Sequence, residues 1–157
     1  MHNTTSLRAR FHRVRRSLLI TGALLSAGIL AAAIAIRSNG VPANLDYSTS
    51  RTSNAGVFNA TYTPGITPIP IHKLHHWTLH LETPDGQPIE GARIQVDGDM
   101  PQHGHGLPTQ PQVTQEFGNG DYLVEGLKFQ MGGWWVMDYQ VTVKNRVDTV
   151  RFNLLLR

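Results

Sequence analysis

Apolar and polar residues alternate along most of the chain after Lys73. Trp77, Leu79 and Leu81 are separated by polar residues, and the same period of two returns over 93–97, 135–144 and 149–156. Successive side chains of a β-strand point to opposite faces, so this period indicates strands with one buried face. The pattern therefore predicts half-buried antiparallel strands in this part of the chain.

Turn-forming sequences separate these runs. They are "TPDGQP" after the first run, "DGDMPQHGHGLP" after the second, "GNGD" before Tyr122 and "MGG" before Trp134. A short turn sequence such as "GNGD" between two apolar runs predicts a hairpin. Six strands at this spacing predict an all-β fold, a small immunoglobulin-like antiparallel β-sandwich over residues 71–157.

An uncharged run of 20 residues, Ser17–Ile36, precedes the folded part. A helix of that length rises about 30 Å, which matches the hydrocarbon core of a bilayer. The run predicts a single N-terminal transmembrane helix that acts as an uncleaved signal anchor. The alternative is a cleavable signal peptide, because small residues offer cleavage sites at Ala31, Ala32, Ala33 and Ala35. The hydrophobic region of such a peptide is normally shorter, about 7–15 residues.

The charges set the expected topology. Six arginines and no acidic residue precede residue 38, and the remainder has 8 Lys and Arg against 11 Asp and Glu, a net charge of −3. Basic residues before the anchor predict a cytoplasmic tail over 1–16 and a periplasmic or extracytoplasmic C-terminal domain. The acidic remainder argues against a nucleic-acid partner. Residues 37–70, in which Ser, Thr, Asn, Gly and Pro dominate, are expected to form an extracytoplasmic linker.

The chain contains no cysteine. This excludes disulfides and thiolate ligands, so a transition-metal site would need His, Met, Asp or Glu. Six of the eight histidines lie between His72 and His105. Imidazole is the commonest metal-binding side chain, so the cluster favours a metal hypothesis.

The candidate ligands are Met100, His103 and His105 in the loop "DMPQHGHGLP", with Met131 in "FQMGGWW". Glycines allow the backbone to fold so that imidazoles two positions apart converge, and thioethers beside imidazoles suit Cu(I). The alternative is an ordinary glycine-rich loop whose methionines fill gaps in the core. His76 and His80 would lie about 13 Å apart on one strand, too far to share an ion.

No motif indicates an enzyme. The sequence contains no G-x-S-x-G, no H-E-x-x-H, no glycine-rich phosphate loop and no suggestive pair of carboxylates. We therefore expect no catalytic residues and no reaction.

The segment from about His76 to Leu156 resembles the YtkA-like and FixH-like group of small extracytoplasmic β-sandwich domains. The resemblance rests on "GARIQVDGDMPQHGHG", "GDYLVEGLKFQMGGWWVMDYQV" and "VDTVRFNLLL". The group's "M-P-x-x-x-H-G" motif falls on Met100, Pro101, His105 and Gly106. Its "G-x-Y" motif falls on Gly120 and Tyr122, and its "M-x-G-x-W" motif falls on Met131, Gly133 and Trp134 or Trp135. Gln102 and His103 stand where the loop often carries a further methionine, which leaves the ligand set open.

The resemblance implies copper handling or the assembly of membrane metalloproteins. Together with the ligand types, it predicts a membrane-anchored copper-binding module that captures or relays copper, with Met100, His103, His105 and Met131 as ligands of Cu(I). The partner would be an acceptor cuproprotein. A metal-free accessory or assembly subunit of a membrane complex is the alternative, with the transmembrane helix and exposed aromatic residues making the contacts.

Overall fold

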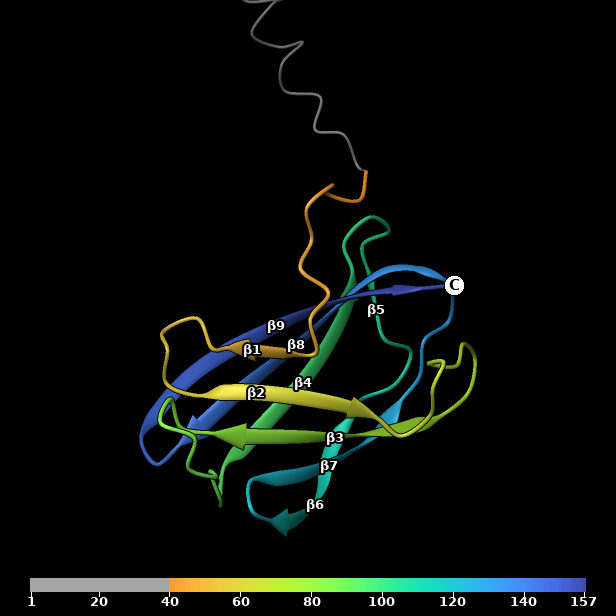
Figure 1. Cartoon of the computed structure of the whole chain (residues 1–157). Coiled ribbons are helices and arrows are strands. Elements are labelled where there is room, and N and C mark those ends of the chain that lie inside the picture. The colour runs from red at the N-terminus through yellow and green to blue at the C-terminus, as the bar shows by residue number, and fades with distance from the viewer. Residues whose placement is uncertain (1–39) are drawn as a thin grey trace, which may run out of the picture. The chain divides into compact units, whose positions relative to one another are not determined.

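The computed structural model describes residues 40–157, and every regular element within that range is a β-strand (Figure 1). No helix long and apolar enough to cross a membrane occurs in this part of the chain. The predicted cytoplasmic tail, 1–16, and signal anchor, 17–36, lie outside the described residues.

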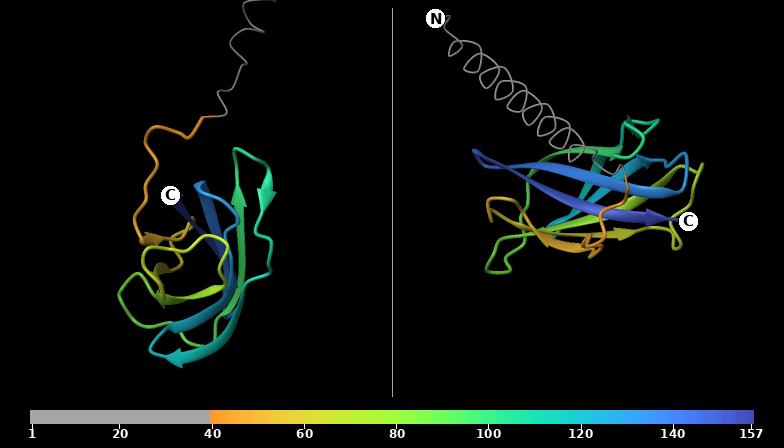
Figure 2. Two further views of the ribbon diagram at one scale, coloured as in Figure 1. Left: turned by 90° about the vertical axis from the view of Figure 1, so that its right-hand side faces the viewer. Right: turned by 90° about the horizontal axis from the view of Figure 1, so that it is seen from above.

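Nine strands form two antiparallel sheets, seen from two further directions in Figure 2. The five-stranded sheet has the order β1-β2-β3-β7-β6, and the four-stranded sheet has the order β5-β4-β8-β9. The strands are β1 (Ser50–Thr52), β2 (Asn59–Pro64), β3 (His75–Glu82), β4 (Arg93–Met100), β5 (His105–Gly106), β6 (Gln112–Gly118), β7 (Asp121–Leu127), β8 (Gly133–Val143) and β9 (Arg146–Leu156). The expected all-β antiparallel fold is confirmed.

The predicted hairpin at "GNGD" is confirmed as β6–β7. Asn119 and Gly120 form the connection and both have positive φ, 53° and 80°. Two consecutive residues with positive φ match the right-handed twist of the flanking strands, and Asn-Gly is the pair that adopts this conformation at least cost. A Cβ on Gly120 would also collide with the carbonyl oxygen of Leu81. This glycine therefore lets β7 begin against β3.

The core lies between the sheets and consists mainly of the residues that the alternation places inside. Trp77, Leu79 and Leu81 of β3 are fully buried. Rings also join the two sheets, since Tyr62 of β2 stacks on Trp77 at 4.6 Å and meets Phe152 of β9 edge-on at 4.9 Å. Aromatic pairs in these arrangements add about 0.5–1.5 kcal/mol beyond the burial of their area.

The linker predicted over 37–70 differs from the structure, because two strands of the sheet lie inside it. Phe58, Ala60 and Tyr62 are buried in the core, and β2 pairs with β3 from Asn59 to Pro64. The period of two is present in "VFNATYT", but the run is short and lies in a segment in which Ser, Thr, Asn, Gly and Pro dominate. Pairing with β3 is what makes this segment a strand, and the folded domain therefore begins before the expected residue 71.

A buried carboxylate fixes the turn between β1 and β2 onto β9. Asp148 accepts hydrogen bonds from the backbone N–H groups of Ala55 at 2.9 Å and Val57 at 3.3 Å. Burial alone would raise the pKa of Asp148, but the hydrogen bonds from Ser53 and from three backbone N–H groups outweigh it and lower the pKa below the usual 3.8. The charged carboxylate is thus the form that the fold requires.

Replacing this carboxylate by an amide, Asp148→Asn, should lower the free energy of unfolding by about 1–3 kcal/mol at pH 7, because hydrogen bonds to a charged group are weakened. A lowered folded-state pKa gives stability that is present above the unfolded pKa of about 3.8 and is lost as pH falls through the folded value. Urea unfolding at pH 7 and at pH 3 should show a smaller gap between wild type and variant at pH 3. An equal gap at both values would contradict this role.

Candidate metal centre

Strand β4 extends further than the sequence predicts and ends at Met100. The expected turn began at "DGD", yet Asp97, Gly98 and Asp99 pair with β8. Gly98 faces the core, where a Cβ would lie 2.7 Å from the Sδ of Met137 and 2.9 Å from Leu107. The glycine therefore marks close packing inside a strand and not a turn, and half of the expected loop belongs to the sheet.

A tight hairpin follows Met100 and projects beyond the sheet (Figure 1). The carbonyl oxygen of Met100 accepts the N–H groups of His103 and Gly104, each at 2.9 Å. The chain then returns as β5, in which His105 lies directly opposite Met100. Opposed residues of an antiparallel pair carry their side chains on the same face, with Cβ atoms about 5 Å apart. The hairpin thus brings a thioether and an imidazole together.

The two loop histidines are close neighbours. Their ring centroids lie 5.5 Å apart, and both side chains are exposed. A ligated imidazole nitrogen lies about 2 Å from its metal ion, which places the centroids of two rings on one ion roughly 5–6.5 Å apart. The observed separation of His103 and His105 falls in this range and is therefore compatible with coordination of one ion by both rings.

The turn that carries Met131 lies at the same end of the sandwich as the hairpin. The side-chain amide of Gln130 donates to the carbonyl of Gly106 at 3.1 Å. The indole N–H of the buried Trp135 donates to the carbonyl of Met131 at 3.0 Å, which fixes the turn to β8. Trp134 points outward and donates to Asn153. The structure therefore brings both predicted loops to one end of the fold.

The two methionines differ in accessibility. Met100 is fully buried and belongs to the core, whereas Met131 is 36% exposed. The Cε of Met100 packs against Gly133, where an added Cβ would lie only 2.5 Å away. The candidate donor set thus combines a buried thioether with two exposed imidazoles. Residues 40–157 contain no cluster of three or more His, Cys, Asp or Glu able to hold a metal ion, so a site here depends on the thioethers.

The strand histidines have other surroundings. His75 is buried on the apolar face of β3, and its Nδ1 lies 3.0 Å from the carbonyl of Lys73. Burial lowers the pKa of His75, although the hydrogen bond with Lys73 opposes the shift. His76 packs over Gly65. His80 is partly exposed, and its Nδ1 lies 2.7 Å from Asp121 Oδ1. Cross-strand register creates this contact, and sequence spacing gives no sign of it.

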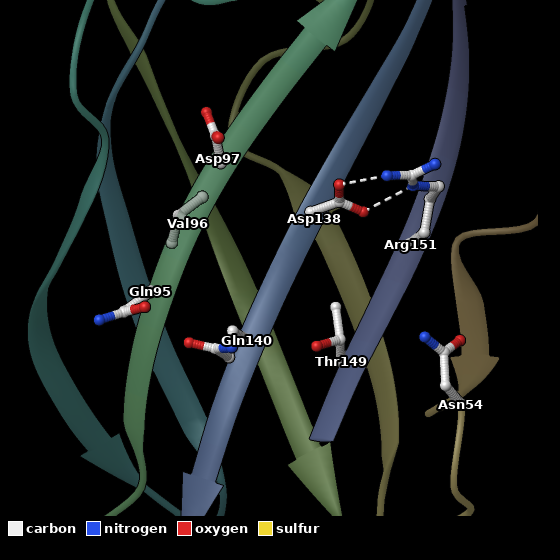
Figure 3. Close-up of a pocket in the computed structure, with 8 residues that line it drawn as sticks. All are labelled: Asn54, Gln95, Val96, Asp97, Asp138, Gln140, Thr149 and Arg151. Carbon is white, nitrogen blue, oxygen red and sulfur yellow. Dashed lines mark hydrogen bonds and ion pairs between the residues drawn. The ribbon is translucent and has the colours of Figure 1, made fainter. Parts of the chain in front are cut away.

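A polar hollow of about 800 Å³ lies on the outer face of the four-stranded sheet (Figure 3). Its lining residues are Asn54, Gln95, Val96, Asp97, Asp138, Gln140, Thr149 and Arg151. Arg151 donates two hydrogen bonds to Asp138, at 2.7 and 2.6 Å, and this contact raises the pKa of Arg151. None of the candidate metal ligands lines the hollow.

Two sheets and a Met/His hairpin define the class of protein, a small antiparallel β-sandwich. Within that class, the model of the YtkA-like family matches residues 50–142, and the chain belongs to this family. The match begins in β1, in agreement with a domain that starts before residue 71.

A solved structure with a similar fold is that of a DUF4426 family protein from Pseudomonas aeruginosa PAO1. It is 15% identical, with a TM-score of 0.50, and the match covers 69% of this chain and 94% of that one. At this identity the likeness concerns the fold alone. No curated protein matches the chain.

The contact between Gly133 and Met100 can be tested by Gly133→Ala. The new Cβ would be strained at φ 127° and would collide with Met100, so the free energy of unfolding should fall by about 1–3 kcal/mol. Gly86→Ala is the matched control, because Gly86 has φ 80° but nothing within 4 Å of an added Cβ.

A double variant with Met100→Ala should recover part of the loss caused by Gly133→Ala, as a double-mutant cycle of chemical denaturation would measure. Additive losses would contradict the contact.

Proposed function

We propose that this protein is a membrane-anchored extracytoplasmic copper-binding module that captures or relays Cu(I) without catalysis. In this proposal an immunoglobulin-like β-sandwich is held at the membrane by a single transmembrane helix over 17–36, with 1–16 in the cytoplasm. The observation that carries the proposal is the strand register that sets His105 opposite Met100. The ring of His103 lies beside His105, with the two ring centroids 5.5 Å apart.

The chemistry of these side chains supports copper as the cargo. Two imidazoles and the thioethers of Met100 and Met131 form a soft, neutral donor set without thiolate. Such ligands favour Cu(I) over harder divalent ions, and they bind it less tightly than cysteines would. His103 and His105 are exposed, so a donor or acceptor can reach the metal, while Met100 contributes from the buried side.

The copper site can be tested by a Cu(I) competition titration against a chromogenic chelator. His103→Ala with His105→Ala should weaken Cu(I) binding at least tenfold, equivalent to about 1.4 kcal/mol, because the two nitrogen ligands are removed. Met100→Leu and Met131→Leu keep similar volumes and should each weaken binding by a smaller factor. His76→Ala, on the other sheet, is the control and should leave the affinity unchanged. Equal affinity in wild type and the double histidine variant would refute the site.

The anchor is tested by sequencing the N-terminus of the mature protein from membranes. An uncleaved anchor predicts a chain that retains residues 1–36 and leaves the membrane only with detergent. A mature N-terminus near Ser38 would show that the segment is a cleaved signal peptide.

The alternative role is that of a metal-free accessory or assembly subunit of a membrane complex. Exposed apolar side chains favour it, namely Leu74, Phe117, Val147 and Leu155, which are 47–61% exposed. This role predicts that Phe117→Ser or Leu155→Ser weakens co-purification with a membrane partner, whereas the histidine variants leave it intact. The copper proposal predicts instead that the histidine variants lose bound metal, whereas Phe117→Ser and Leu155→Ser retain it.

A further inference from the structure

A row of polar side chains that includes His80 and Asp121 lies on the outer face of the five-stranded sheet. Strand register aligns Ser50, Thr61, His80 and Asp121 in one row across β1, β2, β3 and β7. Glu82 follows His80 by two positions and therefore shares its face. These residues belong to the sheet opposite the Met/His hairpin.

The contact with Asp121 orients the His80 ring. An ionised carboxylate only accepts hydrogen bonds, so His80 donates its Nδ1–H to Asp121 Oδ1 at 2.7 Å. In the neutral form of the ring, the other nitrogen, Nε2, carries the lone pair that a metal ion would use. Metal-binding histidines in general donate their second N–H to a carboxylate or carbonyl, which fixes the tautomer and makes the ligand more basic. His80 already has this arrangement.

A second ligand stands beside that nitrogen. Glu82 Oε2 lies 3.9 Å from His80 Nε2, and Asn59 donates to the other carboxylate oxygen of Glu82, Oε1, at 3.4 Å. Two ligands about 2 Å from a tetrahedral ion are roughly 3.4 Å apart, so a small rotation of the Glu82 carboxylate completes the geometry. All three acidic and imidazole side chains are 37–41% exposed, which leaves the site open to solvent.

We propose that His80 and Glu82 form a second metal site, for a divalent ion of the Cu(II) or Zn(II) class, with Asp121 as a positioning residue. The donors are one imidazole nitrogen and one carboxylate oxygen, and no sulfur is present, so the site suits borderline divalent ions and not Cu(I). Two carboxylates around a neutral imidazole also balance the charge of the ion. Water completes the coordination, and bound metal exchanges readily.

The site is independent of the copper site at the other sheet. It is therefore tested in the full-length protein carrying His103→Ala and His105→Ala, so that failure of one proposal leaves the other untouched. Calorimetric titration with Zn²⁺ should show one binding event that His80→Ala removes and that Glu82→Gln weakens at least tenfold. Asp121→Asn should weaken it about 10–100-fold, as for other partners of metal-binding histidines. His76→Ala, from the same face of β3, is the matched control.

Stabilisation of the protein by added metal is a second measurement, and it would not change if these residues had a purely structural role. Zn²⁺ should raise Tm in the parent and in the His76 variant, but not in the His80, Glu82 or Asp121 variants, whatever their Tm without metal. Bound Cu²⁺ should show coupling to a single imidazole nitrogen in its electron paramagnetic resonance spectrum, lost with His80→Ala. Zn²⁺ binding that survives His80→Ala, or that falls equally with His76→Ala, would overturn the proposal.

Discussion

The fold depends on aromatic rings that bridge two sheets with no disulfide between them. The chain has no cysteine, so packing and hydrogen bonds hold the sandwich together. Tyr62 contacts Phe152 across the interface, and Phe129 meets Trp135 edge-on at 5.1 Å. Because Trp135 also donates to the carbonyl of Met131, the same core that joins the sheets sets the position of the turn beside the hairpin. Stability and the candidate metal centre therefore share one structural element.

The hairpin depends on the sheet in a similar way. Gly98 and Gly133 are the points at which strands β4 and β8 admit methionine side chains, Met137 at the first and Met100 at the second. The second contact helps to bury Met100, while His103 and His105 stay exposed. In the proposed copper site, the thioether of Met100 would be shielded from solvent and the imidazoles would remain accessible to a donor or acceptor of Cu(I).

The two proposed sites divide the metal chemistry between the two sheets. One end of the four-stranded sheet carries sulfur and nitrogen donors, and the outer face of the five-stranded sheet carries nitrogen and oxygen donors. Ligand softness separates Cu(I) from divalent ions, so each site would select its own oxidation state or metal. A sandwich suits this arrangement, because residues on the hairpins and on the outer faces can vary without disturbing the core between the sheets.

The sequence by itself determined the all-β class, the buried face of the strands that the alternation predicts, and the identity of the loop residues. Alternation around Trp77 and the turn at Asn119 were sufficient, since they reflect the local geometry of strands and hairpins. The resemblance carried by "MPQHGHG" and "MGGWW" identified the family as well. The sequence did not reveal β2, because its short alternation lies in a segment in which Ser, Thr, Asn, Gly and Pro dominate, and pairing with β3 makes it a strand.

Tertiary structure alone decided which side chains meet. His105 opposes Met100, and His80 meets Asp121 from 41 residues away, because register between strands is set by packing and turns and not by spacing along the chain. The same packing buried Met100 and left Met131 exposed, although the sequence presents both as methionines next to turns. Local sequence patterns determine the chemistry that a residue offers, and long-range strand pairing determines which other residues it contacts.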